Sequence, residues 1–388
     1  MALSEIFIEK RYADKVIERT LASDPRMGGR DRAFIAENVY DLVRWWRLIG
    51  FLSGVEDEID KRAIRQRVAT WFQRKGVELP DWLIDYHIPN DVLEKRMQEA
   101  KKIPAVLHSV PDWLYDLGVE HLGAKKWLHE LENLNEQAEL VVRVNTLKTT
   151  RNELKEMLDT HGMHGQTSKK FADAILLERK GSLFALSEFR NGFFEVQDAG
   201  SQAIAPFMRV APGMRVVDAC AGAGGKTLHI AALMEGKGKI VAMDIEGHKL
   251  EELKRRARRN GVQNIETKLI DDSKAIKRLA NSADRLLLDA PCSGLGVLRR
   301  NPDAKWKLTP EFIEKIQTTQ AEILQSYQQM LKPGGMMVYA TCSILPVENE
   351  LQVQKFLANN KNFELIDEQH LWPSDGFDGF YMALIKKN

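Results

Sequence analysis

The chain has 388 residues, of which 44% are hydrophobic and 29% are charged, and its net charge is +1. This length predicts two or three domains, and the composition excludes a long disordered or fibrous chain. No stretch reaches the roughly 18 apolar residues of a membrane span. The N-terminus mixes charged with apolar residues, unlike a signal peptide.

Three cysteines are too few for a disulfide framework in a chain of this length. Their scarcity indicates a reducing compartment, and we expect a cytoplasmic protein without membrane association. The cysteines form no CxxC pair and the nine histidines do not cluster with them, so no metal site is expected.

Residues 1–137 predict an all-helical domain, because apolar residues recur at spacings of three and four. Six of the eight tryptophans lie in this region. We interpret them as the core of a helical bundle, with a platform for stacking nucleic-acid bases as the alternative.

Residues 138–205 predict a small α+β subdomain. A strand over 138–147 is followed by a helix over 151–163, with Gly162 as its stop, and by a second strand over 173–178.

Residues 206–388 predict an α/β domain with a doubly wound, mostly parallel sheet, because strands and helices alternate from Met214 onward. A long helix is expected to begin with Thr309 as N-cap and Pro310 at its first position. The sequence KPGG at 332–335 is the expected end of that helix.

Ligands of a doubly wound sheet bind beyond the carboxyl ends of its strands. The predicted strand ends carry all three cysteines and several aspartates, so we expect these side chains in one crevice. The alternative is that each cysteine is simply a small buried hydrophobe. The residues at these ends are Asp218, Cys220, Asp244, Asp271, Asp272, Asp289, Cys292 and Cys342.

The sequence DACAGAGGKT at 218–227 predicts a ligand-binding turn that opens a helix, because its glycines allow close approach to the backbone. A phosphate-binding P-loop needs glycine where Cys220 stands. A nucleoside cofactor needs an acid at the end of the next strand to bind ribose hydroxyls, and Asp244 occupies that position. The nucleoside cofactor is therefore favoured.

The sequences DAPCSG at 289–294 and ATCS at 340–343 place thiols beside a carboxylate, which suggests covalent catalysis on an electron-poor ring. Methylation of cytosine at C5 needs a thiolate that adds to C6, an acid at N3 and a group that assists release. Cys342, Asp289 and Cys292 can supply these three groups.

The sequence at 218–227 and the segments 287–306 and 338–350, which contain the two cysteine motifs, resemble the signature motifs of the RNA cytosine-C5 methyltransferase family, which uses S-adenosylmethionine. The similarity continues upstream through 189–202 and 111–149 and covers about 280 residues. It implies that Cys342 attacks C6, that Cys292 assists release of the methylated RNA, and that Asp289 contacts the cytosine.

The resemblance also implies a set of contacts to the methyl donor. Asp244 would bind the ribose, and either Asp271 or Asp272, with Asp272 favoured, would bind the adenine. One departure is Ala223, which stands where the family loop usually carries proline. The implied donor-binding residues are Cys220, Ala221, Gly222, Ala223, Gly224, Gly225, Lys226, Asp244, Asp271, Asp272 and Asp289.

The N-terminal region resembles the NusB-like RNA-binding domain of the bacterial branch that modifies small-subunit ribosomal RNA, through residues 28–46. The middle subdomain resembles the family's RRM-like RNA-binding unit. The resemblance implies a protein that acts on RNA and not on DNA, with small-subunit rRNA favoured and transfer RNA as the alternative. We expect a monomer.

Three other functions are less consistent with the residues. A DNA cytosine methyltransferase would use Cys292 as nucleophile and leave Cys342 unexplained. A P-loop NTPase is disfavoured by Cys220. A non-catalytic ribosome-assembly factor would keep the fold but would need neither thiol.

Two basic segments are candidates for phosphate contact. Lys254–Arg259 is either a solvated helix face or a phosphate-binding face, with neither favoured. Phosphate contact is favoured for Arg299, Arg300, Lys305 and Lys307, which follow Cys292 closely. Trp306 is expected to pack beneath this segment.

Overall fold

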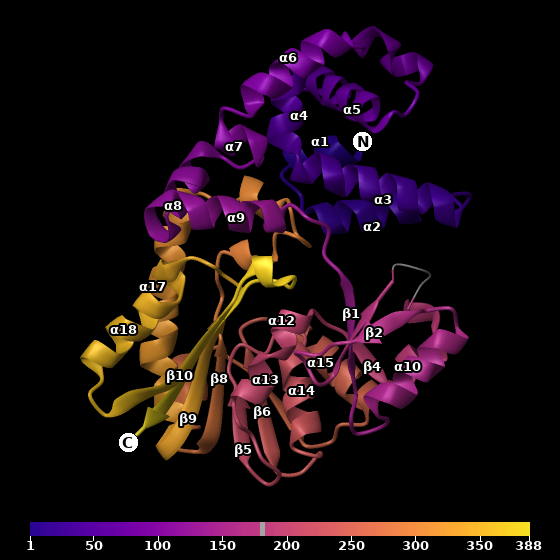
Figure 1. The fold of residues 1–388 in the computed structure, drawn as a ribbon. Coiled ribbons are helices and arrows are strands. Elements are labelled where there is room, and N and C mark those ends of the chain that lie inside the picture. The colour runs from indigo at the N-terminus through magenta and orange to yellow at the C-terminus, as the bar shows by residue number, and fades with distance from the viewer. Residues whose placement is uncertain (179–182) are drawn as a thin grey trace. The chain divides into compact units, whose positions relative to one another are not determined.

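The computed structural model describes residues 1–178 and 183–388, and it divides into two compact units (Figure 1). The first unit comprises Met1–Gln137 and Val297–Pro310, and the second comprises Ala138–Gly296 and Glu311–Asn388. Within the predicted range 206–388, the segment Val297–Pro310 thus packs with the helical unit. The predicted ranges themselves stay predictions, and the range 138–205 includes residues 179–182, which lie outside the described residues.

The first unit is built from helices. Helix α5 shows how their ends are set: Asp60 caps its first turn by accepting a 2.8 Å hydrogen bond from the Ala63 N–H, and Gly76 in the left-handed region ends it. The helices are α1 (Ala2–Phe7), α2 (Ala13–Ala22), α3 (Gly29–Arg44), α4 (Trp46–Ser53), α5 (Lys61–Lys75), η1 (Asp81–Tyr86), α6 (Asn90–Ala100), α7 (Pro104–Leu107), α8 (Asp112–Leu122), α9 (Ala124–Leu134) and η4 (Ala304–Trp306).

Tryptophans form part of the core of this unit. Trp46, Trp71 and Trp127 are buried, which confirms the packing interpretation for these three, whereas Trp82 is 61% exposed. Trp306 packs against the same core and donates a 2.7 Å hydrogen bond from Nε1 to the Val43 carbonyl. Its predicted packing role is confirmed.

The second unit begins with a small antiparallel sheet in the order β2-β3-β1-β4. Helix α10 follows β1, capped by Thr150, whose hydroxyl accepts from the Glu153 N–H, and Leu154 and Leu158 of this helix are buried in the subdomain core. The elements are β1 (Leu140–Val144), α10 (Arg151–Thr160), β2 (Gly165–Thr167), β3 (Ala174–Leu177), η2 (Leu183–Ala185), α11 (Ser187–Arg190) and β4 (Phe194–Val196).

The rest of the second unit is a seven-stranded sheet in the order β10-β11-β9-β8-β5-β6-β7. Strands β9, β8, β5, β6 and β7 are parallel, and at one edge β11 pairs antiparallel with β9 and β10 pairs antiparallel with β11. The central strands are near-continuous apolar runs, as expected for strands buried on both faces. The strands are β5 (Arg215–Asp218), β6 (Lys239–Asp244), β7 (Ile265–Leu269), β8 (Ala283–Asp289), β9 (Leu331–Thr341), β10 (Phe363–Leu371) and β11 (Phe380–Lys387).

Helices connect these strands in the alternation that the sequence predicts. In the part of the chain that the structure describes, no helix has the length and apolar character to cross a bilayer. The helices are α12 (Ala199–Gln202), α13 (Ile204–Phe207), α14 (Gly225–Leu233), α15 (Gly247–Asn260), α16 (Ser273–Lys277), η3 (Leu295–Val297), α17 (Pro310–Tyr327), η5 (Gln328–Met330), η6 (Pro346–Glu348), α18 (Glu350–Asn359) and η7 (Pro373–Asp375).

Helix α17 begins at Pro310 as predicted, but its predicted end at 332–335 is wrong. The helix ends at Tyr327, and KPGG lies within β9. The pairing of β8 with β9 moves from Ala283–Leu331 to Arg285–Met336, so residues 332–335 form an irregularity that accommodates proline and a glycine at φ 76°.

Candidate functional site

The predicted crevice forms where the order of the large sheet reverses, between β5 and β8. Asp218, Asp244 and Asp289 are the last residues of β5, β6 and β8, and Cys342 follows the last residue of β9. These four parallel strands are neighbours in the sheet, so their carboxyl ends meet at one edge.

Two thiols lie together at this edge. The Sγ atoms of Cys292 and Cys342 are 3.3 Å apart and share a hydrogen bond, although 50 residues separate them along the chain. The pairing of Asp289 with Ala340 in adjacent strands brings the two loops side by side. The sequence-predicted convergence of these two cysteines is therefore seen in the structure.

A buried carboxylate joins the two cysteine loops. Glu348 accepts hydrogen bonds from the Ser293 N–H at 2.8 Å, from the Ser293 and Ser343 hydroxyls at 2.5 Å each, and from Gln320 Nε2 at 3.1 Å. Ser293 follows Cys292 directly and Ser343 follows Cys342 directly. Glu348 is fully buried, so these bonds replace its hydration and fix the spacing of the thiols.

Sequence reasoning missed this role of Glu348. Glu348 lies in the segment 338–350 that contains the motif of Cys342, and this is the only feature of the sequence that marks it. A glutamate is ordinarily expected to be solvated and not buried.

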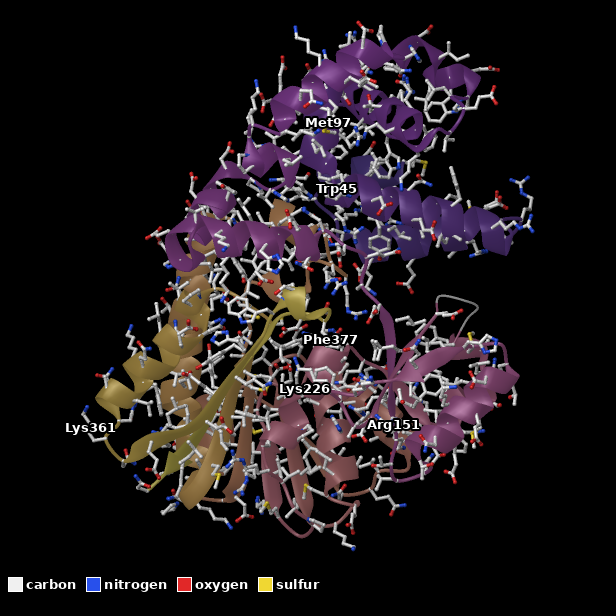
Figure 2. The ribbon with its side chains drawn as sticks, in the orientation of Figure 1. Trp45, Met97, Arg151, Lys226, Lys361 and Phe377 are labelled. Atoms are coloured by element: carbon white, nitrogen blue, oxygen red, sulfur yellow. The ribbon has the colours of Figure 1, made fainter. Side chains whose placement is uncertain are left out.

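Opposite charges flank the thiol pair. Lys226 (Figure 2) donates a 2.6 Å hydrogen bond to Asp289 Oδ2. Burial alone would lower the pKa of Lys226, but the charges of Asp289 and Cys342 outweigh burial and raise it. The hydrogen bond with Cys342 raises the pKa of Cys292, and burial and the negative charge of Glu348 raise it further. Cys292 is thus held as a neutral thiol.

The Gly-rich loop between β5 and α14 bends through two glycines in the left-handed region, Gly222 at φ 54° and Gly224 at φ 88°. Asp244 accepts hydrogen bonds from two loops. Its Oδ2 accepts from the Gly222 N–H of the Gly-rich loop, and its Oδ1 accepts from the Glu246 N–H just after β6, each at 2.8 Å. The Asp244 carboxylate thereby orders the loop as well as facing the crevice.

Burial shifts two other groups near the loop, Asp218 and Cys220, toward their neutral forms. Burial raises the pKa of Asp218 to about 7, although its Oδ2 accepts a 2.7 Å hydrogen bond from the Thr227 hydroxyl. Burial also raises the pKa of the Cys220 thiol. A reactive cysteine needs a lowered pKa, so Cys220 does not have the properties of a nucleophile.

A cavity of about 470 Å³ lies against the loop. This volume is within the range for sites of drug-sized ligands. Its lining combines carboxylates with apolar side chains: Ala219, Cys220, Gly222, Asp244, Ile245, Glu246, Lys249, Asp289, Pro291, Thr319, Glu322, Ile323, Ser326 and Tyr327. Among the described residues, no cluster of three or more His, Cys, Asp or Glu side chains has the arrangement of a metal site.

Comparison with known proteins places this geometry in a family. A family model described as 16S rRNA methyltransferase RsmB/F matches residues 206–386, and a model of the RsmF/B-like ferredoxin-like domain matches residues 110–183. A Synechocystis protein named probable ribosomal RNA small subunit methyltransferase B is 30% identical, over all of this chain and 98% of the relative. The chain belongs to the RsmB/F family of 16S rRNA methyltransferases.

Two further relatives agree with this assignment. Ribosomal RNA small subunit methyltransferase B of Klebsiella pneumoniae is 35% identical, over 77% of this chain and 72% of the relative. A crystal structure titled as a methyltransferase homolog protein from Pyrococcus horikoshii is 28% identical with a TM-score of 0.65, over 74% of this chain and 98% of the other. The predicted α/β class with a small α+β subdomain is confirmed.

Membership of the RsmB/F family makes the chain an S-adenosylmethionine-dependent rRNA methyltransferase, and the predicted methyl donor is confirmed. The cavity suits this donor. At Gly222 a Cβ would meet open space, so the loop backbone is accessible to a ligand. Asp244 and Glu246 offer acceptors for hydroxyl groups, and Ile323 and Tyr327 offer apolar surface for a planar base.

The predicted donor-binding residues fall into two groups in the structure. Four of them line the cavity: Cys220, Gly222, Asp244 and Asp289. The other predicted loop residues belong to the same segment, 220–226, as Cys220 and Gly222. Asp271 and Asp272 are exposed and are absent from the described lining, and Asp272 instead caps α16 by accepting from the Lys274 and Ala275 N–H groups. The assignment of an adenine contact to Asp272 stays a prediction.

Several lining residues were not predicted. Thr319, Glu322, Ile323, Ser326 and Tyr327 come from α17, which is distant from the strand-end motifs in the sequence. No motif marks them, since a cavity-facing helix side has the same pattern as a core-facing one.

The first basic segment is largely paired within the second unit. Lys254 and Arg255 bind Glu251 and Glu252 of the same helix, and Arg259 binds Glu195. Two residues of the second segment are buried within the first unit, Arg299 at 5% exposed and Lys305 at 1%, whereas Arg300 and Lys307 are partly exposed. Phosphate contact was the favoured interpretation for Arg299 and Lys305, and it is wrong because these side chains are packed inside.

Proposed function

We propose that the chain methylates C5 of a cytosine in small-subunit rRNA and that Cys342 forms a covalent bond to C6 during the reaction. The observation that carries this proposal is the pair of sulfur atoms 3.3 Å apart beside the donor cavity. Methyl transfer to a base nitrogen or a ribose oxygen needs no thiol. C5 of cytosine is a poor nucleophile until a thiolate adds to the neighbouring carbon.

In the proposed reaction, the Cys342 thiolate forms the S–C6 bond, and the electron pair of the C5–C6 double bond becomes available at C5. The hydrogen-bonded pair of Asp289 and Lys226 is assigned to N3 of the cytosine, where it stabilises the developing negative charge by donating a hydrogen to that atom. S-adenosylmethionine, when bound, supplies the methyl group to C5. Solvent water then takes the C5 proton, the electron pair of that C–H bond restores the C5–C6 double bond, and the S–C6 bond breaks to release the Cys342 thiolate. Cys292 assists this release as a neutral thiol that hydrogen-bonds the departing sulfur across the 3.3 Å contact.

The charges around the thiols support this division of roles. The pKa of Cys292 is raised by its hydrogen bond with Cys342, by burial and by the negative charge of Glu348, so this thiol is held neutral. A DNA-type mechanism would instead need Cys292 as the thiolate nucleophile.

Transfer of a labelled methyl group tests this function directly. The protein is incubated with labelled S-adenosylmethionine and, separately, with small-subunit rRNA, transfer RNA and DNA, and the products are digested to nucleosides. We expect label in 5-methylcytidine from the rRNA. Label in another nucleoside, or in DNA, would overturn the proposed chemistry. Label in 5-methylcytidine from transfer RNA alone would overturn the proposed substrate.

A further inference from the structure

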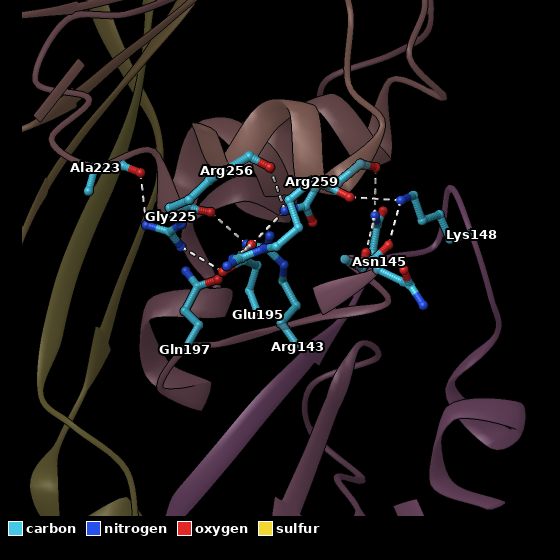
Figure 3. A network of polar contacts seen from close by, with 12 residues as sticks. Arg143, Asn145, Lys148, Glu195, Gln197, Ala223, Gly225, Arg256 and Arg259 are labelled. Atoms are coloured by element: carbon cyan, nitrogen blue, oxygen red, sulfur yellow. Dashed lines mark hydrogen bonds and ion pairs between the residues drawn. The ribbon is translucent and has the colours of Figure 1, made fainter. Parts of the chain in front are cut away.

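Two arginines outside the donor cavity hydrogen-bond the backbone of the Gly-rich loop (Figure 3). Arg256 Nη1 donates to the Ala223 carbonyl at 2.8 Å, and Arg143 Nη1 donates to the Gly225 carbonyl at 2.6 Å. The two carbonyls flank Gly224, one of the two loop glycines in the left-handed region. Both contacts are charge-assisted, and such bonds are about twice as strong as neutral ones.

Arg256 is itself held by the small subdomain. Glu195 of β4 is 3% exposed and accepts from Arg256 Nη2 at 3.0 Å, from Arg259 Nη2 at 2.5 Å and from Asn260 Nδ2 at 2.5 Å. Burial alone would raise the pKa of Glu195, but the charges of Arg256 and Arg259 outweigh burial and lower it. Glu195 therefore stays a carboxylate and fixes the guanidinium that holds Ala223.

Other groups fix the small subdomain to the end of α15. Asn145 Nδ2 donates to the Asn260 carbonyl at 2.9 Å, and Lys148 Nζ donates to the Arg259 carbonyl at 2.7 Å (Figure 3). Helix ends leave such carbonyls without partners in the helix. The small sheet thus supplies partners to α15 and, through Arg143 and Glu195, to the donor loop.

We propose that Arg143 and Arg256 are positioning residues for S-adenosylmethionine, and that Glu195 makes the donor loop depend on the small subdomain. The segment Gly222–Gly225 contains three glycines, and Ala223 lacks the fixed φ of the proline usual in related loops. A loop with this freedom loses conformational entropy when it binds a ligand. The two arginine contacts remove that freedom before the donor arrives.

Arg256→Met tests the proposal, with Arg255→Met as the matched control. Arg255 is the preceding residue of the same helix, its side chain is 69% exposed, and it binds Glu252 on the helix surface. Calorimetry with S-adenosylmethionine should show about tenfold weaker binding for Arg256→Met, the scale of one lost charge-assisted hydrogen bond. Arg255→Met should bind as the unmodified protein does.

A second substitution separates loop positioning from general stability. Ala223→Pro in the Arg256→Met background restores a fixed φ in the loop and should recover most of the lost affinity. Turnover should show a raised KM for the donor and a nearly unchanged kcat. Unchanged affinity in folded Arg256→Met, with a lowered melting temperature alone, would overturn the proposal, as would a double variant that recovers nothing.

Glu195→Gln covers the case in which Arg256→Met does not fold. This change keeps the volume and one acceptor but removes the charge that fixes Arg256, so a severalfold loss of donor affinity is expected. Glu195→Gln that folds and binds the donor normally would contradict the role of the small subdomain. These measurements concern donor binding and are independent of the thiol chemistry.

Discussion

The thiol pair and the donor loop lie at the same edge of one sheet but are held in different ways. Glu348, six residues after Cys342, joins the two cysteine loops through three hydrogen bonds from Ser293 and Ser343, and it accepts a fourth from Gln320 of α17. The donor loop is held instead by Arg143 and, through Arg256, by Glu195 of a separate subdomain. The reacting groups are thus positioned by loops and a helix that flank their own sheet, whereas donor binding depends on a separate subdomain.

The largest effect is expected at the nucleophile. Cys342→Ala should abolish methyl transfer and leave the affinity for S-adenosylmethionine near normal, because the thiol acts on the base and not on the donor. Transfer of labelled methyl and calorimetry measure the two properties separately. Retained turnover would exclude Cys342 as the nucleophile.

A smaller but still large effect is expected at the residue that joins the cysteine loops. Glu348→Ala should lower kcat by about a hundredfold, the scale of a small displacement of reacting groups, and leave donor affinity near normal. Glu348→Gln keeps the side-chain volume and some of the acceptors and should lose less. If both variants weaken donor binding as much as turnover, the separation of the two regions is wrong.

An intermediate effect is expected at Asp244, which orders the donor loop from the cavity side. Asp244→Ala should weaken donor binding by roughly 1.5–3 kcal/mol, the range for hydrogen bonds to charged groups. Part of the loss comes from the Gly222 N–H, which loses its acceptor. Calorimetry that finds unchanged affinity would show that the donor binds elsewhere.

The smallest effect is expected in the buried basic segment. Lys305→Met should leave the salt dependence of RNA binding unchanged, because Lys305 is buried and donates to Asn135 within the helical unit. A lysine that contacts phosphate would change the slope of log affinity against log salt by about one. A slope reduced by that amount would restore the phosphate interpretation.

The sequence predicts well which side chains come together in the crevice, because residues at the carboxyl ends of parallel strands meet at one edge of the sheet. Asp244, Asp289, Cys292 and Cys342 were found on that rule. Contacts between distant elements leave no such signal. Tyr327 of α17 and Glu195 of β4 reach the donor region only through tertiary packing.

Charge is the other source of error in reading the sequence. Arg299 and Lys305 have the composition of a solvated basic patch, yet they pack inside the helical unit. Long basic side chains can bury their apolar stems, and the pattern of letters does not distinguish this from exposure. The segment KPGG at 332–335 is ambiguous in the same way, because proline and glycine can end a helix or interrupt the pairing of a strand. The sequence therefore predicted a helix end where the structure has an irregular part of β9.

Trapping of a covalent protein–RNA adduct tests the two-cysteine account most directly. Cys292→Ala, incubated with S-adenosylmethionine and small-subunit rRNA, should accumulate a slow, denaturant-resistant band, because attack by Cys342 proceeds and release fails. Cys292→Ala combined with Cys342→Ala should give no such band. If Cys292→Ala turns over freely and traps no RNA, the two-cysteine mechanism is wrong for this protein.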